Sequence, residues 1–328
     1  RAGLANACRF KFEATRVDDP PDVGALNEAR MHAEEACRLD SDCAEAWAAL
    51  STVLHAFGAD TAAVVAARHA VVLEPSNWRH VLRLAWVSWG EGRLRAAERA
   101  LQMLPGLALA HWFAATVHVA RQAFPAAARH LDAGSRAQDA QHQHEARFGA
   151  VGLHWLRGLV RLHYGDEAGA LDAFQRELIF EHIAEHIHAR EACANAWYAI
   201  GAAHVRRGAR EEALAAFDQA RLRVPNHLMA SVGRVMLGAG SLATLHAAIT
   251  SRSQAADVEP PFEIALAKAV GHIAAGRQAA AVDIIRHTLN QAASFSAGWL
   301  IPVEPLLHVA VAPDAWAEVL TALRTRAA

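Results

Sequence analysis

Apolar residues recur along the chain at the three- and four-residue spacing of amphipathic helices, interrupted at intervals by glycine and proline. In Ala194–Asn226, one such segment runs to Gly208, and a second runs from there to Pro225. Glycine supplies the left-handed turn that ends one helix, and proline commonly follows the end of another. The pattern therefore predicts two helices joined into a hairpin.

The hairpin pattern repeats several times with a period of about 34 residues. Ala44–Asn77 is a second clear copy, with Gly58 at its turn and Pro75 at its end. Weaker copies start at Trp78, near Leu109 and near Val151. Stacked hairpins of this length bury one another's apolar faces, so the repeats predict one elongated all-helical array.

Residues at fixed places in Ala194–Asn226 resemble the signature of the tetratricopeptide repeat family, although His204 stands where that family usually has tyrosine. The matching residues are Trp197, Ile200, Gly201, Gly208, Ala213, Phe217, Ala220 and Pro225. The resemblance implies an all-α fold, a right-handed α-α superhelix of about eight helix pairs with a concave groove. It also implies that the groove binds a protein or peptide.

The predicted organisation is a single tetratricopeptide-like solenoid over residues 1–328. Residues 1–43 form an N-terminal helix pair, and residues 44–225 carry the recognisable repeats. Residues 226–292 are degenerate repeats, and residues 293–328 are a C-terminal cap whose last helix has a polar outer face.

The resemblance also implies which side chains of each first helix face the groove. These are mostly aromatic residues and arginines, the types enriched in binding hot spots. The alternative for Trp86 and Trp155 is that they fill the core between repeats. The predicted groove residues are Arg79, Trp86, Trp89, Phe113, Arg121, Trp155, His163, Asn195, Tyr198 and Arg206.

Charge and composition exclude several other kinds of partner. The net charge is −2 with both signs interleaved, which argues against a nucleic-acid or membrane surface. No apolar run approaches the roughly 20 residues that span a bilayer. The four cysteines lack metal-type pairing and are expected to be reduced thiols in a cytoplasmic protein. Homodimer formation is left open.

The string His182-Ile183-Ala184-Glu185-His186 has the H-x-x-E-H spacing of the inverted zinc peptidases. On one helix these polar residues would share a face. A third ligand, Glu263, follows 77 residues after His186. It belongs to a hairpin two repeats further on, roughly 20 Å away for helices packed about 8–10 Å apart. Zinc–ligand bonds are only about 2.0–2.3 Å long, so the sequence disfavours a catalytic zinc site.

A non-catalytic metal site is the alternative, because two long junctions between repeats are rich in histidine. If both junctions emerge on one edge of the solenoid, their side chains gather there; otherwise they are solvated loops. The candidate ligands are His142, His144, His182, Glu185, His186 and His188.

The prediction for function is therefore a non-catalytic protein-interaction scaffold or sensor region without a cofactor. The alternative is a metal-binding protein or metal-dependent hydrolase that uses the histidine-rich edge. The repeats are also similar to the C-terminal tetratricopeptide regions of bacterial multidomain regulators, and the chain does not begin with methionine. We therefore expect it to be part of a larger bacterial regulatory protein.

Overall fold

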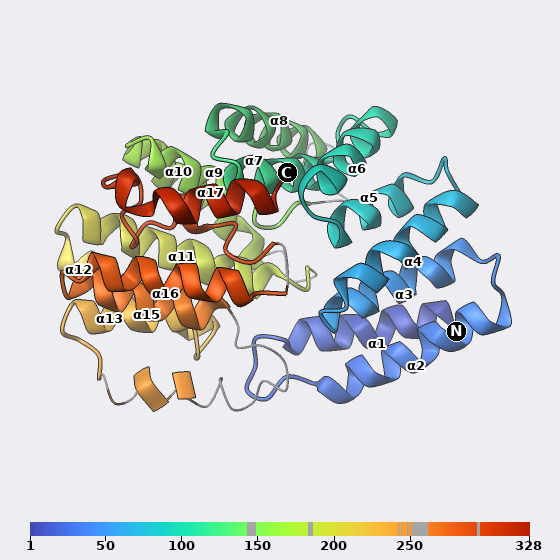
Figure 1. Ribbon diagram of the computed structural model, residues 1–328, viewed down its shortest axis with the longest axis horizontal. Helices are drawn as coiled ribbons and strands as arrows, with labels where there is room; N and C mark the ends of the chain where they lie inside the picture. Colours follow the sequence, from blue (N-terminus) through green and yellow to red (C-terminus); the bar gives the residue numbers. More distant parts are fainter. Residues whose placement is uncertain are drawn as a thin grey trace. The chain divides into compact units, whose positions relative to one another are not determined.

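The computed structural model describes residues 1–142, 149–182, 186–241, 243, 245–247, 249–250, 262–293 and 296–328 (Figure 1). Within these ranges the chain is helical and contains no β-strand, so the predicted all-α class is confirmed. No described helix is long and apolar enough to cross a membrane.

The chain divides into two compact units. Unit 1 comprises residues 1–117 and 129–150, and unit 2 comprises residues 118–128 and 151–328. The prediction of one continuous solenoid over residues 1–328 stays a prediction.

Unit 1 is built from consecutive helix hairpins (Figure 1). Helices α1 with α2, α3 with α4, and α5 with α6 make the most extensive contacts, and α2 packs on α3 as α4 packs on α5. The helices are α1 (Ala2–Thr15), α2 (Val23–Leu39), α3 (Ala44–Ala56), α4 (Asp60–Leu73), α5 (Trp78–Val87) and α6 (Gly90–Met103). Helices α7 (Ala108–Ala120) and α8 (Phe124–His142) contribute residues to both units.

Unit 2 repeats this arrangement. Helix α9 pairs with α10, α11 with α12, and α15 with α16, while α13 packs against both α12 and α15. The helices are α9 (Leu153–His163), α10 (Glu167–Leu178), α11 (Ala189–Arg206), α12 (Arg210–Arg223), α13 (Leu228–Met236), α15 (Phe262–Ala274), α16 (Gln278–Gln291) and α17 (Ala317–Arg326). In the described part of this unit, the short 3₁₀ helices are η1 (Ile179–His182), η2 (Ile301–Val303) and η3 (Pro313–Trp316).

The clearest hairpin folds as its sequence predicts. Gly208 has φ +72° and lies between α11 and α12, where its N–H donates to the Val205 carbonyl. The side chain of Phe217 on α12 is fully buried. A Cβ added at Gly201 on α11 or at Gly233 on α13 would come within 2.5 Å of its ring. The two glycines therefore let three helices close around one aromatic side chain.

Helix α5 is shorter than its repeat predicts, because Arg93 binds its C-terminal end. Arg93 is 8% exposed. Nε donates to the carbonyls of Ala85 (3.1 Å) and Ser88 (2.8 Å), and Nη2 donates to that of Trp86 (2.9 Å). A cation at a helix C-terminus satisfies carbonyls that lack intrahelical partners. Burial lowers the pKa of Arg93 to about 9.

This early end corrects the placement of Trp89. The sequence placed it on the first helix of its hairpin, in line with Arg79 and Trp86, but α5 ends at Val87. Trp89 has an extended backbone and stacks on the Arg93 guanidinium at 4.7 Å. It therefore does not share the helix face of the other two residues.

Replacing Gly201 by alanine should destabilise the protein by about 1–3 kcal/mol, since the new methyl group would overlap the Phe217 ring. Urea unfolding followed by circular dichroism measures the change. Gly271→Ala is the matched control, because Gly271 is an exposed glycine within α15 with no atom within 4 Å of the added Cβ. It should stabilise by roughly 0.5–1 kcal/mol through helix propensity. Equal effects of the two substitutions would contradict the packing described for Phe217.

Two candidate binding faces

The first candidate site is a face shared by the first helices of the three hairpins in unit 1. Helix α3 packs against both α1 and α5, so the three helices lie next to one another. We call this surface the α1/α3/α5 face and define it by Asn6, Arg9, Glu45, Arg83 and Trp86.

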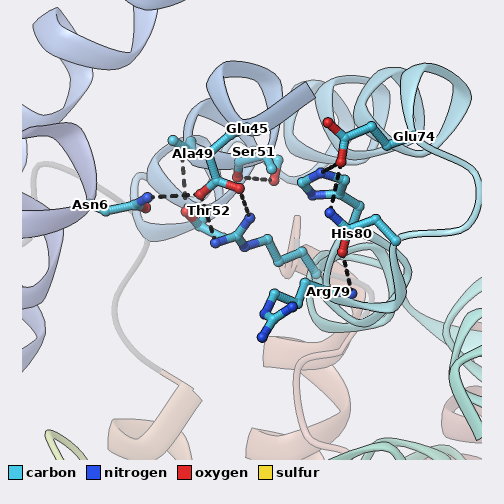
Figure 2. A network of polar contacts seen from close by, with 11 residues as sticks. Asn6, Glu45, Ala49, Ser51, Thr52, Glu74, Arg79 and His80 are labelled. Atoms are coloured by element: carbon cyan, nitrogen blue, oxygen red, sulfur yellow. Dashed lines mark hydrogen bonds and ion pairs between the residues drawn. The ribbon is translucent and has the colours of Figure 1, made fainter. Parts of the chain in front are cut away.

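A carboxylate on the middle helix links its two neighbours. The Asn6 amide donates to Glu45 Oε1 at 3.1 Å, and Arg83 donates to both Glu45 oxygens at 2.7 and 3.0 Å. Figure 2 shows Asn6 and Glu45 turned toward each other. Partial burial raises the pKa of Glu45, but the Arg83 guanidinium outweighs this effect and holds the pKa below its ordinary value. Since both side chains are partly exposed, the Arg83–Glu45 ion pair contributes only about 0–1 kcal/mol to the stability of the fold. Its main effect is to orient Arg83.

The neighbouring Arg9 is unusual because it is an arginine with only 5% exposure. Its guanidinium lies over the Phe10 ring at 4.5 Å and 5.9 Å from the Trp86 ring. Nε and Nη1 have no hydrogen-bond partner, and the carboxylate of Glu13 is 3.6 Å from Nη1. Burial lowers the pKa of Arg9; Glu13 opposes that effect, and the positive charge of Arg83 adds to it.

Two guanidinium groups thus lie close together on one surface beside an aromatic ring. An added anion beside the partly exposed Arg83 would relieve their repulsion, although the Arg9 Nε and Nη1 atoms are buried out of its reach. The α1/α3/α5 face is therefore suited to a carboxylate.

Of the groove residues predicted in this unit, two lie in line on α5. Arg79 is exposed, with its guanidinium over the Trp78 ring at 4.6 Å, and Trp86 is half-buried. Arg83 lies between them on the same side of the helix, at i+4 from Arg79. Phe113 is 3% exposed and 6.4 Å from Trp86, so it packs in the core behind that residue and presents no surface to a ligand.

The second candidate site is the face of α9 and α11 in unit 2, and residues 299–311 lie on it. We call these residues the C-terminal segment. Ile301 to Leu307 are seven consecutive buried residues, and η2 packs against α9. A buried stretch outside the α-helices must satisfy its backbone polar groups. Here the Val303 N–H donates to the Leu300 carbonyl, and the Glu304 N–H donates to the Ile301 carbonyl. Pro302 and Pro305 have no N–H group that needs an acceptor.

Side chains fix the C-terminal segment to the helices. The Tyr198 hydroxyl on α11 donates to the carboxylate of Glu304, and His163 on α9 hydrogen-bonds the Pro302 carbonyl. Leu306 and Leu307 are fully buried in the core cluster that includes Tyr198 and residues of α13 and α15. The cavity that remains has a volume of about 20 Å³, enough for about one water molecule. The segment therefore fills this face.

Four predicted groove residues of unit 2 contact or line the C-terminal part of the chain. Tyr198 and His163 bind the C-terminal segment directly, and Arg206 lines the small cavity beside it. Arg121 Nε donates to the Ala327 carbonyl at 2.8 Å, beyond the segment. The sequence did not connect these residues with the C-terminal part of the chain, because residues 293–328 are predicted only as a terminal cap.

The remaining two predicted residues lie apart from this contact. Asn195 on α11 hydrogen-bonds His227 at 3.1 Å, and Trp155 is half-buried on α9. The backbone N–H of Trp155 donates to Glu177, which also accepts from Gly152. Glu177 therefore binds the N-terminus of α9. Binding roles for all the predicted groove residues stay predictions.

Two buried carboxyl groups in unit 2 have strongly raised pKa values. Burial raises the pKa of Glu304 to about 7, against the hydrogen bonds from Tyr198 and the Leu306 N–H. Burial also raises the pKa of Glu177 to about 7, against the N–H groups at the start of α9. Burial raises the pKa of Tyr198 as well, and the adjacent Glu304 adds to the shift.

The H-x-x-E-H string does not lie on one helix. His182 ends η1, residues 183–185 lie outside the described residues, and His186 precedes α11. His186 lies outside a helix, so the condition that the string forms one helix is not met at that residue. The rings of His186 and His188 are 5.7 Å apart.

The candidate metal edge remains a prediction, because much of it falls outside the described part of the chain. The side chains of His142 and His182, and all of His144 and Glu185, belong to that undescribed part. Among the residues whose side chains are described, no group of three or more His, Cys, Asp or Glu is placed to hold a metal ion.

Comparison with known proteins supports the fold. No protein-family profile matches the chain, and no curated protein sequence matches it. A chain in the crystal structure of the APC/C hetero-tetramer Cut9–Hcn1 matches with a TM-score of 0.56 and 16% identity. The match covers 82% of this chain and 47% of that one, so this chain spans about half its length. The chain has a tetratricopeptide-like solenoid fold.

Two other solved tetratricopeptide structures show weaker likeness. Yeast Tom70 matches with a TM-score of 0.48 and 11% identity, over 90% of this chain and 60% of that one. YrrB, a tetratricopeptide protein described with an unusual peptide-binding site, matches with a TM-score of 0.37 and 18% identity. That match covers 60% of this chain and 95% of YrrB.

The raised pKa of Glu304 predicts a pH-dependent stability. The folded state holds the proton more tightly than the unfolded state, where the ordinary value is 4.5. This contribution is complete below about pH 4.5 and is lost as the pH rises to about 7. Glu304→Gln stays neutral and can still accept from Tyr198, so its unfolding midpoint should fall less between about pH 5 and pH 8 than that of wild type.

Urea unfolding at several pH values tests this expectation. Glu177→Gln should also reduce the fall of the unfolding midpoint with rising pH, because burial raises the pKa of that carboxyl as it does for Glu304. Glu211→Gln, an exposed residue on α12, serves as the control and should keep the wild-type slope. A wild-type slope in Glu304→Gln would show that this carboxyl is not held buried.

Proposed function

We propose that this chain is a non-catalytic protein-interaction module that binds an extended acidic segment of a partner protein on the α1/α3/α5 face. The observation that carries the proposal is the pair Arg9 and Arg83 beside Trp86. Arg9 is buried, and the charge of Arg83 adds to the lowering of its pKa. A ligand carboxylate at the partly exposed Arg83 would supply the negative charge that this pair of arginines lacks.

The spacing of arginines on α5 favours a particular ligand pattern. Arg79 and Arg83 are one turn apart, which is about 6 Å along the helix axis. Side chains two residues apart on an extended peptide are separated by about 6.6–6.8 Å and point to the same side. Acidic residues at every second position therefore match the two arginines. Apolar contact would come from Trp86, the aromatic type that commonly anchors interfaces.

We further propose, from the sequence resemblance, that the chain is a region of a larger bacterial regulator and that it works in the cytoplasm without a cofactor. A partner that is a protein rather than a nucleic acid or membrane fits the mixed charge of the chain. Homodimer formation remains open under this proposal.

Fluorescence anisotropy with labelled peptides tests the acidic-ligand proposal. One peptide carries glutamate at every second position, and its matched partner carries lysine at those positions. The glutamate peptide should bind the full chain at least about tenfold more tightly, with an affinity that falls as salt is added.

Arginine variants locate the site of binding. Arg79→Gln combined with Arg83→Gln should lower the affinity for the glutamate peptide about tenfold, because two charge contacts are lost. Arg95→Gln is the matched control, because Arg95 on α6 is an exposed arginine paired with Glu91. Equal binding of both peptides, or an equal loss in the Arg95 variant, would refute the proposed site.

A further inference from the structure

The C-terminal segment binds the face of α9 and α11 as a ligand would. The sequence of residues 301–307 is Ile-Pro-Val-Glu-Pro-Leu-Leu, and it follows no helical or strand periodicity. The hydrogen bonds between this segment and α9 or α11 involve side chains of the helices, from Tyr198 and His163. The backbone N–H groups of Ile301, Val303, Glu304 and Leu307 donate only within residues 298–307.

This pattern has an energetic consequence. Detaching the segment breaks no main-chain ladder with the helices, so its hold depends on apolar burial and on the contacts of Tyr198 and His163. Glu304 is 4% exposed and has no cationic partner among the described residues. A buried carboxyl without a cation gives specificity more than stability. The face thus recognises an acidic side chain between prolines but holds it with limited strength.

We propose that the α9/α11 face is a second binding site, specific for a peptide of the form apolar–Pro–apolar–Glu–Pro–apolar in a 3₁₀ and turn conformation, which the C-terminal segment occupies in cis until a partner peptide of this chemistry displaces it. The inference goes beyond the proposed function, because it concerns unit 2 and an apolar, proline-containing ligand rather than an acidic one. The proposed partner peptide has the sequence pattern of residues 301–307, which occupy this face in the structure.

Covalent linkage explains why the C-terminal segment, and not a free peptide, occupies the α9/α11 face in the isolated chain. A linked ligand acts at an effective concentration in the millimolar range, so a free peptide of equal intrinsic affinity is excluded at lower concentrations. Weakening the cis contact should therefore reveal binding of the same sequence supplied in trans. The intact chain permits this test without truncation.

The probe is a fluorescein-labelled peptide with the sequence of residues 299–311, and binding is followed by anisotropy. Glu304→Lys places an unpaired cation in the buried site and should release the segment, so it should bind the peptide at least about tenfold more tightly than wild type does. Adding Tyr198→Phe to that variant should lower its affinity for the peptide about fivefold, because the hydroxyl that binds the peptide's glutamate is removed. A peptide with lysine in place of that glutamate should not bind.

Controls keep the outcome interpretable. Glu211→Lys, the same charge change at an exposed position on α12, should leave peptide affinity at the wild-type value. If Glu304→Lys loses its helical circular dichroism, Leu306→Ala provides a second test, since it weakens the cis contact without changing charge; affinity should rise at least about threefold. Wild-type affinity in every variant that remains folded would overturn the inference and make the segment a fixed part of the core.

The same assay separates this inference from the proposed function. The double variant Arg79→Gln and Arg83→Gln should bind the 299–311 peptide as wild type does, because those arginines lie in unit 1. Binding of the glutamate peptide without any binding of the 299–311 peptide to folded variants would reject the second site alone.

Discussion

The structure depends on the close packing of consecutive helix hairpins, because a single hairpin cannot bury its own apolar face. Phe217 shows how this packing is achieved, since its ring occupies the space left by Gly201 and Gly233. Side chains of larger volume at those two positions would push α11 and α13 away from α12. The same packing brings the first helices of neighbouring hairpins side by side, as α3 contacts α1 and α5. Each candidate face is thus a product of hairpin stacking.

The two faces differ because their residues differ. The α1/α3/α5 face combines arginines with a carboxylate and a half-buried tryptophan, so it presents positive charge beside an aromatic ring. The α9/α11 face presents Tyr198 among small and apolar residues, and it is covered by the chain's own proline-containing segment. We infer that the first face suits an acidic partner segment and the second an apolar one. Unit 1 and unit 2 would then offer different specificities on the same repeat architecture.

Much of the fold follows from sequence periodicity, because hairpin turns and helix spacing are local properties. The turn at Gly208 and the burial of Phe217 were both predictable from the repeat pattern. The end of α5 was not, since it depends on Arg93 reaching back to three carbonyls from the next helix. The burial of Arg9 was equally hidden, because a charged residue on a helix is expected to be exposed. The C-terminal segment lacks periodicity, although its apolar run with two prolines signalled a buried, non-helical stretch.

Residues 301–307 are held on the α9/α11 face by burial and by the contacts of Tyr198 and His163. Amide hydrogen exchange of the wild-type chain, resolved to single residues, measures that hold most directly. The account predicts that the N–H groups of Val303, Glu304 and Leu307 exchange at least about 100-fold more slowly than in an unstructured peptide, because opening requires the segment to detach. Exchange at the rate of an unstructured peptide would contradict it and leave the face of α9 and α11 uncovered.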